Sequence, residues 1–387
     1  MRRVIGWGMT VRRATWVGLA VAVVVAALAG CTPAEQPPEP TGAASPTSPQ
    51  SPSASTPASG QVSEVEDLIG DLDVPWGLAF LPDGQAVVTL RDAAQLVLVG
   101  PDGAATDVTG PGADELTDVV VPGGEGGLLG VAVLGSSGSA VDLALYATAA
   151  DDNRVLRGTL DGSSLGELRP ILTGIEKAGN HDGGRLAVGP DGFLYVTTGD
   201  AGNPPSAQDP DSLNGKILRI TAEGEPAPGN PDEDSPVWSL GHRNVQGIGW
   251  APDGRMFASE FGQNTWDELN LIEPGGNYGW PEVEGMGSRD GFVQPLAVWG
   301  TDDASPSGLA VTDDAVYLAG LRGERLWRVP LTDDGVGTPQ ALLVGERGRL
   351  RAVEPAPDGS LWVVTGNTDG RGSVRPGDDR LLRVVVD

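Results

Sequence analysis

The chain has 387 residues, and its 53 acidic side chains outnumber its 25 Lys and Arg side chains, which gives a formal net charge of -28. A protein of this charge repels the phosphate backbone, so the composition argues against nucleic acid as a partner. The single cysteine, Cys31, excludes an intramolecular disulfide.

The first 30 residues have the pattern of an export signal. Arginines at positions 2, 3, 12 and 13 precede an apolar run over residues 16–29, which ends in small residues. The uncharged run is marginal in length for a transmembrane helix, the alternative interpretation, so residues 1–30 are interpreted as a signal peptide. The residues Leu28-Ala29-Gly30-Cys31 resemble a bacterial lipobox, in which the cysteine is lipidated and becomes the mature N-terminus.

The lipobox predicts an exported lipoprotein at the outer face of the cytoplasmic membrane. A soluble secreted protein and export by a twin-arginine route are the alternatives. Residues 31–60 are rich in Pro, Ser, Thr and Ala and cannot form a core, which predicts an extended tether. The lipid on Cys31 would be the only membrane contact, and residues 61–387 would form the folded domain.

Residues 61–387 contain a repeated unit of short apolar strands joined by turns that often read Pro-Asp-Gly. The unit begins at six places, which are Trp76, Leu128, Gly184, Ile248, Gly308 and Val353. Closing strands follow in the runs QLVLVG, NRVLRGTL, GKILRI, DELNLI, ERLWRVPL and DRLLRVVV. No amphipathic helical stretch is recognised. The regular spacing therefore predicts an all-β fold, a six-bladed β-propeller, in preference to a pair of β-sandwiches.

The stretch over residues 241–281 concentrates polar side chains beside short strands. These side chains are His242, Arg243, Asn244, Gln246, Glu260, Asp267 and Glu268. The first four are predicted to lie on a loop, before strands over residues 248–250 and 256–259. Carboxylates and the free carbonyls of the glycine-rich segment 275–280 suit a hard cation. A hairpin with solvated carboxylates is the purely structural alternative.

Seven motifs then point to a known family. Between Val74 and Asp387 they occur in the order VPWGLAFLPDG, EGGLLGVAV, HDGGRLAVGPDGFLYVTTGD, GKILRI, GHRNVQG, DELNLIEPGGNYGWP and GRLRAVEPAPDG. Together they resemble the soluble pyrroloquinoline quinone (PQQ)-dependent sugar dehydrogenases of the glucose/sorbosone dehydrogenase group. The resemblance implies a six-bladed propeller with PQQ and calcium over its central channel. It also implies oxidation of an aldose at the anomeric hydroxyl to a lactone.

The resemblance assigns the catalytic base to His181, in a polar, glycine-rich segment before a strand. In the family, this histidine takes the proton of the anomeric hydroxyl as hydride moves to the quinone. Asp200 matches the carboxylate that orients the histidine, which an imidazole needs in order to act as a base near pH 7. The other histidine, His242, is expected to support its loop.

PQQ is a planar tricarboxylate, so its site should offer forked, planar donors. The resemblance assigns this role to Arg349 and Arg351, which alternate on one strand face. It places Arg243 and Asn244 beside the quinone oxygens, which makes Arg243 a catalytic candidate as well. Arg322 stands where the glucose dehydrogenases have a lysine. Without the resemblance, Arg349 and Arg351 would be interpreted as surface residues of a strand.

The resemblance also implies calcium sites. The catalytic ion would be held by PQQ and by the backbone carbonyls of Gly262 and Gln263, and it would polarise the quinone carbonyl. Gln263 replaces a proline of the family, and Phe261 replaces a glutamine that touches the cofactor. A second, structural ion would involve Glu268 and Tyr278.

Substrate specificity is expected to differ from that of the glucose dehydrogenases. Glu125 stands where they carry a glutamine near the sugar, and the chain lacks their long insertions in the fourth blade. The shorter frame is similar to the broad aldose dehydrogenases of the group. An aldose and an electron acceptor of unassigned identity are therefore the expected partners.

Two other classes of function use related propellers. A calcium-dependent lactonase-like hydrolase would share the architecture but would not need three arginines converging on a tricarboxylate. A cofactor-free binding module would not need His181, Asp200 and Arg243. The sequence favours the dehydrogenase over both.

Overall fold

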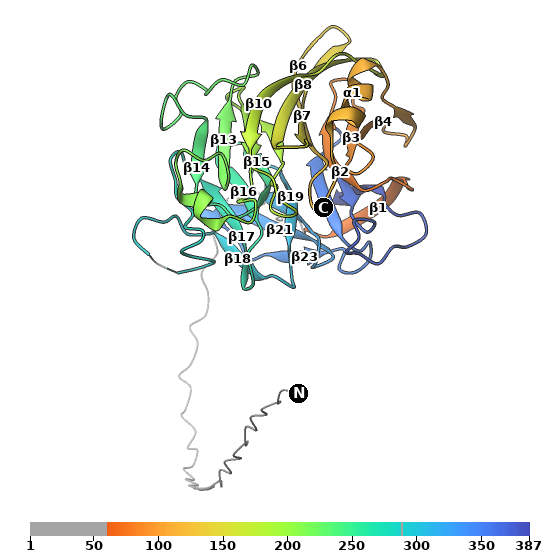
Figure 1. The fold of residues 1–387 in the computed structure, drawn as a ribbon. Helices are drawn as coiled ribbons and strands as arrows, with labels where there is room; N and C mark the ends of the chain where they lie inside the picture. The colour runs from red at the N-terminus through yellow and green to blue at the C-terminus, as the bar shows by residue number, and fades with distance from the viewer. Residues whose placement is uncertain (1–59, 288) are drawn as a thin grey trace, which may run out of the picture. The chain divides into compact units, whose positions relative to one another are not determined.

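The computed structural model describes residues 60–287 and 289–387, which form six antiparallel sheets of four or five strands (Figure 1). The predicted signal peptide, the lipidation candidate Cys31 and all of the predicted tether except Gly60 lie outside the described residues. Within the described part of the chain, no helix is long and apolar enough to cross a membrane.

Each sheet is one blade, and its strands follow one another along the chain except in the last blade, whose outer strand is β1. The first blade consists of β2 (Pro75–Phe80), β3 (Ala86–Leu90), β4 (Gln95–Val99) and β5 (Ala105–Asp107), and the second of β6 (Leu128–Ser137), β7 (Ala140–Thr148), β8 (Asn153–Asp161) and β10 (Arg169–Ile175), with β9 (Ser164–Leu165) paired to β8. The third blade consists of β11 (Leu186–Val188), β12 (Leu194–Thr197), β13 (Lys216–Ile220) and β14 (Val237–Leu240), and the fourth of β15 (Val245–Trp250), β16 (Met256–Glu260), β17 (Trp266–Ile272) and β18 (Ala297–Gly300). The fifth blade consists of β19 (Pro306–Val311), β20 (Ala315–Gly320), β21 (Arg325–Thr332) and β23 (Gln340–Leu342), with β22 (Gly335–Val336) paired to β21, and the sixth of β24 (Leu350–Pro355), β25 (Leu361–Thr365), β26 (Leu381–Val386) and β1 (Val62–Ile69).

The first strands of the blades close a ring. Strands β2, β6, β11, β15, β19 and β24 each contact the next, and β24 returns to β2. The last blade is completed by β1, which pairs with β26 from Val62 opposite Val386 to Ile69 opposite Leu381. Figure 1 shows this meeting of the two ends of the domain, with the C-terminus beside β1. The pairing leaves no open edge at the point where the ring closes.

The hydrophobic core is divided into six layers, one between each pair of neighbouring blades. Because blades are covered on both faces, their central strands are mostly apolar and buried. In β3, for example, all five residues are buried. Trp76 of β2 packs against Leu129 of β6 and Leu186 of β11, so one side chain joins three blades.

The predicted fold class is confirmed, since the structure is an all-β, six-bladed propeller. Each predicted repeat coincides with the first two strands of a blade, and each predicted closing strand coincides with the third. Two local predictions were wrong. Gln246 lies inside β15 and not on a loop. The segment after β5 forms a helix, α1 (Pro111–Val119), which was missed because it is only nine residues long and buries only Gly112 and Leu116.

Candidate active site

One pocket of about 400 Å³ lies where the innermost strands begin. Its lining residues come from all six blades, so the pocket lies on the axis of the ring. They are Trp76, Arg91, Glu125, His181, Arg243, Asn244, Gln246, Phe261, Gly262, Ser305, Leu321, Arg322, Arg349, Arg351 and Arg371. Each lies at or just before a first strand, or just after a second strand. The size is typical of a small-molecule site.

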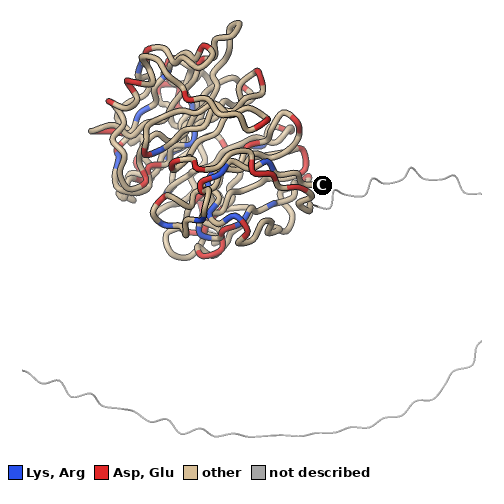
Figure 2. The backbone as a smooth tube through the Cα atoms, turned by 90° about the vertical axis from the view of Figure 1, so that its right-hand side faces the viewer, with Lys and Arg blue, Asp and Glu red and all other residues tan. Residues whose placement is uncertain are grey.

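The pocket is positively charged in a strongly acidic protein. Acidic residues are spread along the backbone of the whole domain (Figure 2), yet six arginines and one glutamate line the pocket. Four carboxylates form ion pairs with these arginines, which leaves positive charge in excess. A concave site of this charge attracts anions.

His181 and Asp200 form a hydrogen-bonded pair at the pocket wall. Nδ1 of His181 lies 2.6 Å from Oδ1 of Asp200. The other carboxylate oxygen accepts the indole N–H of Trp280 at 2.8 Å. Burial raises the pKa of Asp200, but the hydrogen bonds from His181, Trp280 and Gly202 outweigh burial and hold the pKa below its ordinary value. An ionised Asp200 fixes the proton of His181 on Nδ1, which leaves Nε2 as an acceptor.

The backbone of His181 is held in an unusual conformation, with φ at 61°. Its N–H donates to Oε2 of Glu125 at 2.9 Å, and its carbonyl accepts the N–H of Ala201 at 3.2 Å. A Cβ at Gly199 would lie 1.9 Å from the His181 carbonyl oxygen, so only glycine fits there. These contacts fix the left-handed backbone that carries the imidazole.

Arg349 and Arg351 are clamped by one buried carboxylate. Nη2 of Arg349 lies 2.8 Å and Nη2 of Arg351 3.1 Å from the same oxygen of Asp369. Burial lowers the pKa of Arg351 to about 10, so it stays protonated at neutral pH. Its Nη1 donates to Gln246 at 3.1 Å. The predicted pair of arginines therefore lies inside the pocket as a buried, rigid fork, and not on the protein surface.

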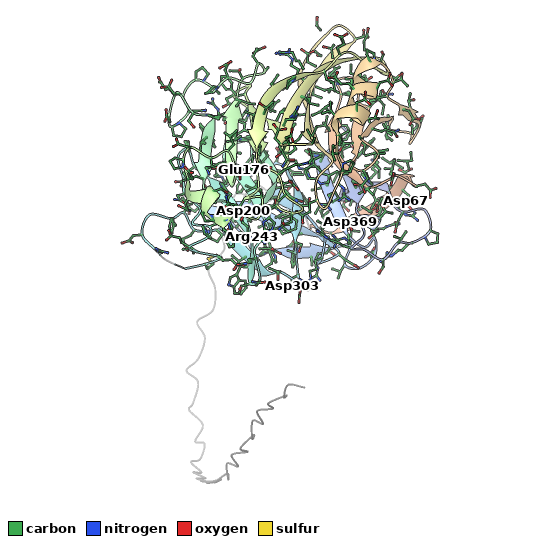
Figure 3. The ribbon with its side chains drawn as sticks, viewed as in Figure 1. Asp67, Glu176, Asp200, Arg243, Asp303 and Asp369 are labelled. Carbon is green, nitrogen blue, oxygen red and sulfur yellow. The ribbon has the colours of Figure 1, made fainter. Side chains whose placement is uncertain are left out.

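Arg243 and Asn244 lie directly before β15, on the side of the pocket near Asp200 (Figure 3). The carbonyl of Arg243 accepts the N–H of Asp200 at 2.8 Å. Nη1 of Arg243 donates to the carbonyl of Phe261 at 3.2 Å, whereas its buried Nε has no hydrogen-bond partner among the described residues. An unpartnered buried donor is costly unless a ligand satisfies it. Oδ1 of Asn244 accepts the N–H of Gly183 at 3.1 Å, which ties the loop of His181 to β15.

Arg322 lies at the rim. Its side chain is 61% exposed, and it pairs at 2.5 Å with Asp302, which is 78% exposed. Exposed pairs are weak, so Arg322 can exchange this partner for a ligand. His242 lies outside the pocket lining, buried between Ser239 and Glu260, in the supporting place expected of it.

The candidate carbonyls for the catalytic calcium lie on the loop after β16. Gly262 lines the pocket, and its N–H donates to Asp267 at 2.9 Å. The carbonyl oxygens of Gly262 and Gln263 accept no hydrogen bond from any residue the structure describes. Glu284 accepts the next four N–H groups along the loop, from Gln263 to Trp266. This loop therefore offers free carbonyls of the kind that calcium prefers.

The residues assigned to a second calcium ion, Glu268 and Tyr278, are held by hydrogen bonds in the structure. The hydroxyl of Tyr278 donates to the carbonyl of Leu271 at 2.6 Å, and both oxygens of Glu268 accept N–H donors. Among residues 60–287 and 289–387, no group of three His, Cys, Asp or Glu side chains could hold a metal ion. We therefore derive no role for a second ion.

Several pocket residues were not singled out from the sequence. They include Arg91 and Arg371, and Asp369, which clamps Arg349 and Arg351, was also missed. All three follow the second strand of a blade, but at different distances from the end of that strand. The repeats therefore gave no signal for these positions.

These features define a class: a six-bladed propeller with an axial, anion-binding pocket and a histidine–aspartate pair in its wall. Residues 72–383 match the family model described as Glucose / Sorbosone dehydrogenase. The chain belongs to this family, and the resemblance inferred from the motifs is confirmed.

Named relatives and solved structures support the same family. The PQQ-bound aldose sugar dehydrogenase of Streptomyces coelicolor is similar in structure, with a TM-score of 0.80 and 50% identity over 86% of this chain and all of that one. The aldose sugar dehydrogenase YliI of Escherichia coli is 30% identical over 79% of this chain and 91% of its own length. The quinoprotein glucose dehydrogenase B of Acinetobacter calcoaceticus is 30% identical over 58% of this chain and 54% of its own. The chain is thus a sugar dehydrogenase, which sets aside the hydrolase and the binding module.

Proposed function

We propose that the protein uses PQQ and one calcium ion to oxidise the anomeric hydroxyl of an aldose to a lactone. The observation that carries the proposal is the arginine fork of Arg349 and Arg351 over buried Asp369, in a pocket of six arginines. Planar guanidinium groups match the carboxylates of PQQ. Arg243 also lines the pocket, and its buried Nε–H has no hydrogen-bond partner among the described residues.

When bound, PQQ supplies the two-electron acceptor that no amino-acid side chain provides. The chain supplies the proton acceptor. Nε2 of His181 takes the proton of the anomeric hydroxyl, while Asp200 stabilises the imidazolium that results. Calcium would be held by the carbonyls of Gly262 and Gln263 together with oxygens of the cofactor and water, because side-chain ligands do not cluster there in the described residues.

Titration of the purified apo-domain with PQQ tests the cofactor assignment. We expect saturable binding with calcium present and much weaker binding with a chelator, because the ion and the arginines together neutralise the anionic cofactor. Absorbance of the quinone reports the bound fraction. Failure to saturate with calcium supplied would contradict the proposal.

We further propose that the protein is exported and held at the outer face of the cytoplasmic membrane by lipid on Cys31, as the lipobox pattern indicates. Replacing Cys31 by Ser should move the protein from the membrane fraction to the soluble fraction with unchanged specific activity. Unchanged membrane association of the variant would refute lipidation as the anchor and favour a retained transmembrane helix, the alternative interpretation of the N-terminal apolar run.

A further inference from the structure

A salt bridge links the mouth of the pocket to the proposed base. Nη1 of Arg371 donates to Oε1 of Glu125 at 2.9 Å, and Oε2 of Glu125 accepts the backbone N–H of His181 at 2.9 Å. Burial raises the pKa of Glu125, but the contacts with His181 and Arg371 lower the pKa by more than burial raises it. The pKa of Glu125 therefore lies below its ordinary value. Glu125 is therefore an anion that positions His181, and each of its oxygens already accepts an N–H group.

The guanidinium of Arg371 has N–H groups that no protein group in the described residues accepts. Its backbone N–H is anchored to Asp369 at 2.9 Å, so the residue is fixed at the pocket mouth. Its side chain lines the pocket and is 55% exposed. Beyond the Nη1 bond to Glu125, its guanidinium donates to no other residue within the described ranges. Nε and Nη2 thus form a free edge of the kind that binds a carboxylate with two parallel hydrogen bonds.

We propose that Arg371 is a specificity residue that favours aldoses carrying a carboxylate, such as hexuronates, over neutral aldoses. The proposal rests on the proposed function and names its substrate class. The carboxylate of Glu125 bridges Arg371 to the backbone N–H of His181, and Arg371 and His181 line the same pocket. The anomeric hydroxyl would meet Nε2 of His181, and the acidic group at the far end of the sugar would meet the free edge of Arg371.

The test compares PQQ-loaded wild type with Arg371→Gln. Arg289→Gln is the matched control, because Arg289 is also 55% exposed and paired with a carboxylate, Glu282, but does not line the pocket. We expect wild type and control to prefer D-glucuronate to D-glucose in kcat/KM. Arg371→Gln should lower that preference about ten- to hundredfold, since a charge-assisted pair is worth roughly 1.5–3 kcal/mol and each 1.4 kcal/mol is a factor of ten.

A binding measurement on the same loaded proteins removes the dependence on turnover. Glucarate and gluconate differ only in the group at C6, a carboxylate or a hydroxymethyl group, and calorimetry gives the affinity of each. Wild type should bind glucarate more tightly, and Arg371→Gln should bind both alike.

Equal binding of the two acids by wild type, or an unchanged preference in Arg371→Gln, would overturn the proposal. Loss of PQQ affinity in Arg371→Gln without a change in preference would overturn it as well, because Arg371 would then be a cofactor ligand. A stronger response to glucose 6-phosphate than to glucuronate would overturn the choice of carboxylate. Absence of turnover with every aldose would instead contradict the proposed function, and the binding measurement would still decide the role of Arg371.

Discussion

Replacing His181 by Asn is expected to lower aldose oxidation by about 100- to 10,000-fold, the usual effect of removing a general base. The affinity for PQQ should change little, because among the described residues the arginine fork and its Asp369 clamp form no hydrogen bond or ion pair with the imidazole, and they lie on another blade. Asn keeps a polar side chain of similar reach and tolerates the left-handed backbone at this position, so the fold should be retained.

The measurement is steady-state turnover of the reconstituted variant, with PQQ titration as the control for loading. Asp200→Asn should show a related and smaller loss, because it disturbs the tautomer and orientation of His181 without deleting the base. Turnover of His181→Asn within about threefold of wild type would refute the assignment, since that is far short of the loss expected for a general base. Loss of PQQ binding would show that His181 supports the cofactor and is not the base.

The second large effect is expected at Asp369, which the sequence did not single out. Asp369→Asn should lower the free energy of unfolding of the apo-domain by about 3–5 kcal/mol, because two buried guanidinium groups lose their shared counter-charge. PQQ carries carboxylates that can take the place of this charge. The destabilisation should therefore shrink when PQQ and calcium are bound.

Asp302→Asn is the matched control, because it removes one carboxylate from an arginine, Arg322, that is exposed at the rim of the same pocket. An exposed pair contributes about 0–1 kcal/mol, so this variant should unfold nearly as wild type does. Chemical denaturation of both variants, with and without PQQ, gives the comparison. Equal stability of the two apo-variants would contradict the role of Asp369 as the clamp of the arginine fork.

The pH dependence follows from the depressed pKa of Asp200. A carboxylate whose folded pKa lies below its unfolded value stabilises the fold above the unfolded pKa, and the contribution is lost as pH falls through the folded pKa. Asp200 should therefore stay ionised throughout the neutral range. Its interaction with His181 should weaken only in strong acid.

The architecture was predictable because it is encoded locally and six times over. Four of the six repeats join their first two strands by a Pro-Asp-Gly turn, and a third strand-like run follows in every repeat, so the first three strands of each blade can be read from adjacent residues. The outer strands could not be read in this way. Strand β5 is three exposed residues long, and β1 is recognisable as part of a blade only from its partner β26, more than 300 residues away.

The candidate site was predictable only where a motif carried it. His181, Arg349 and Arg351 occur within motifs of the family, whereas Asp369 and Arg371 do not. The function of Arg371 depends on Glu125, 246 residues distant, and closure of the ring brings the two together. No pattern of neighbouring residues in the sequence indicates such a pair. Glu125 lines the pocket, where the resemblance predicts a residue near the sugar, and its bond to the backbone of His181 is a second role that the sequence did not indicate.

We expect the pocket to pass electrons from an aldose to PQQ bound by the arginines of its lining. The most direct measurement mixes calcium-reconstituted, PQQ-loaded protein with an excess of aldose in the absence of oxygen and any other acceptor, and follows the quinone absorbance. We expect loss of one quinone per active site, at a rate that His181→Asn reduces and Arg289→Gln does not. A quinone spectrum that stays unchanged with neutral and acidic aldoses alike, in protein shown to be loaded, would contradict the account.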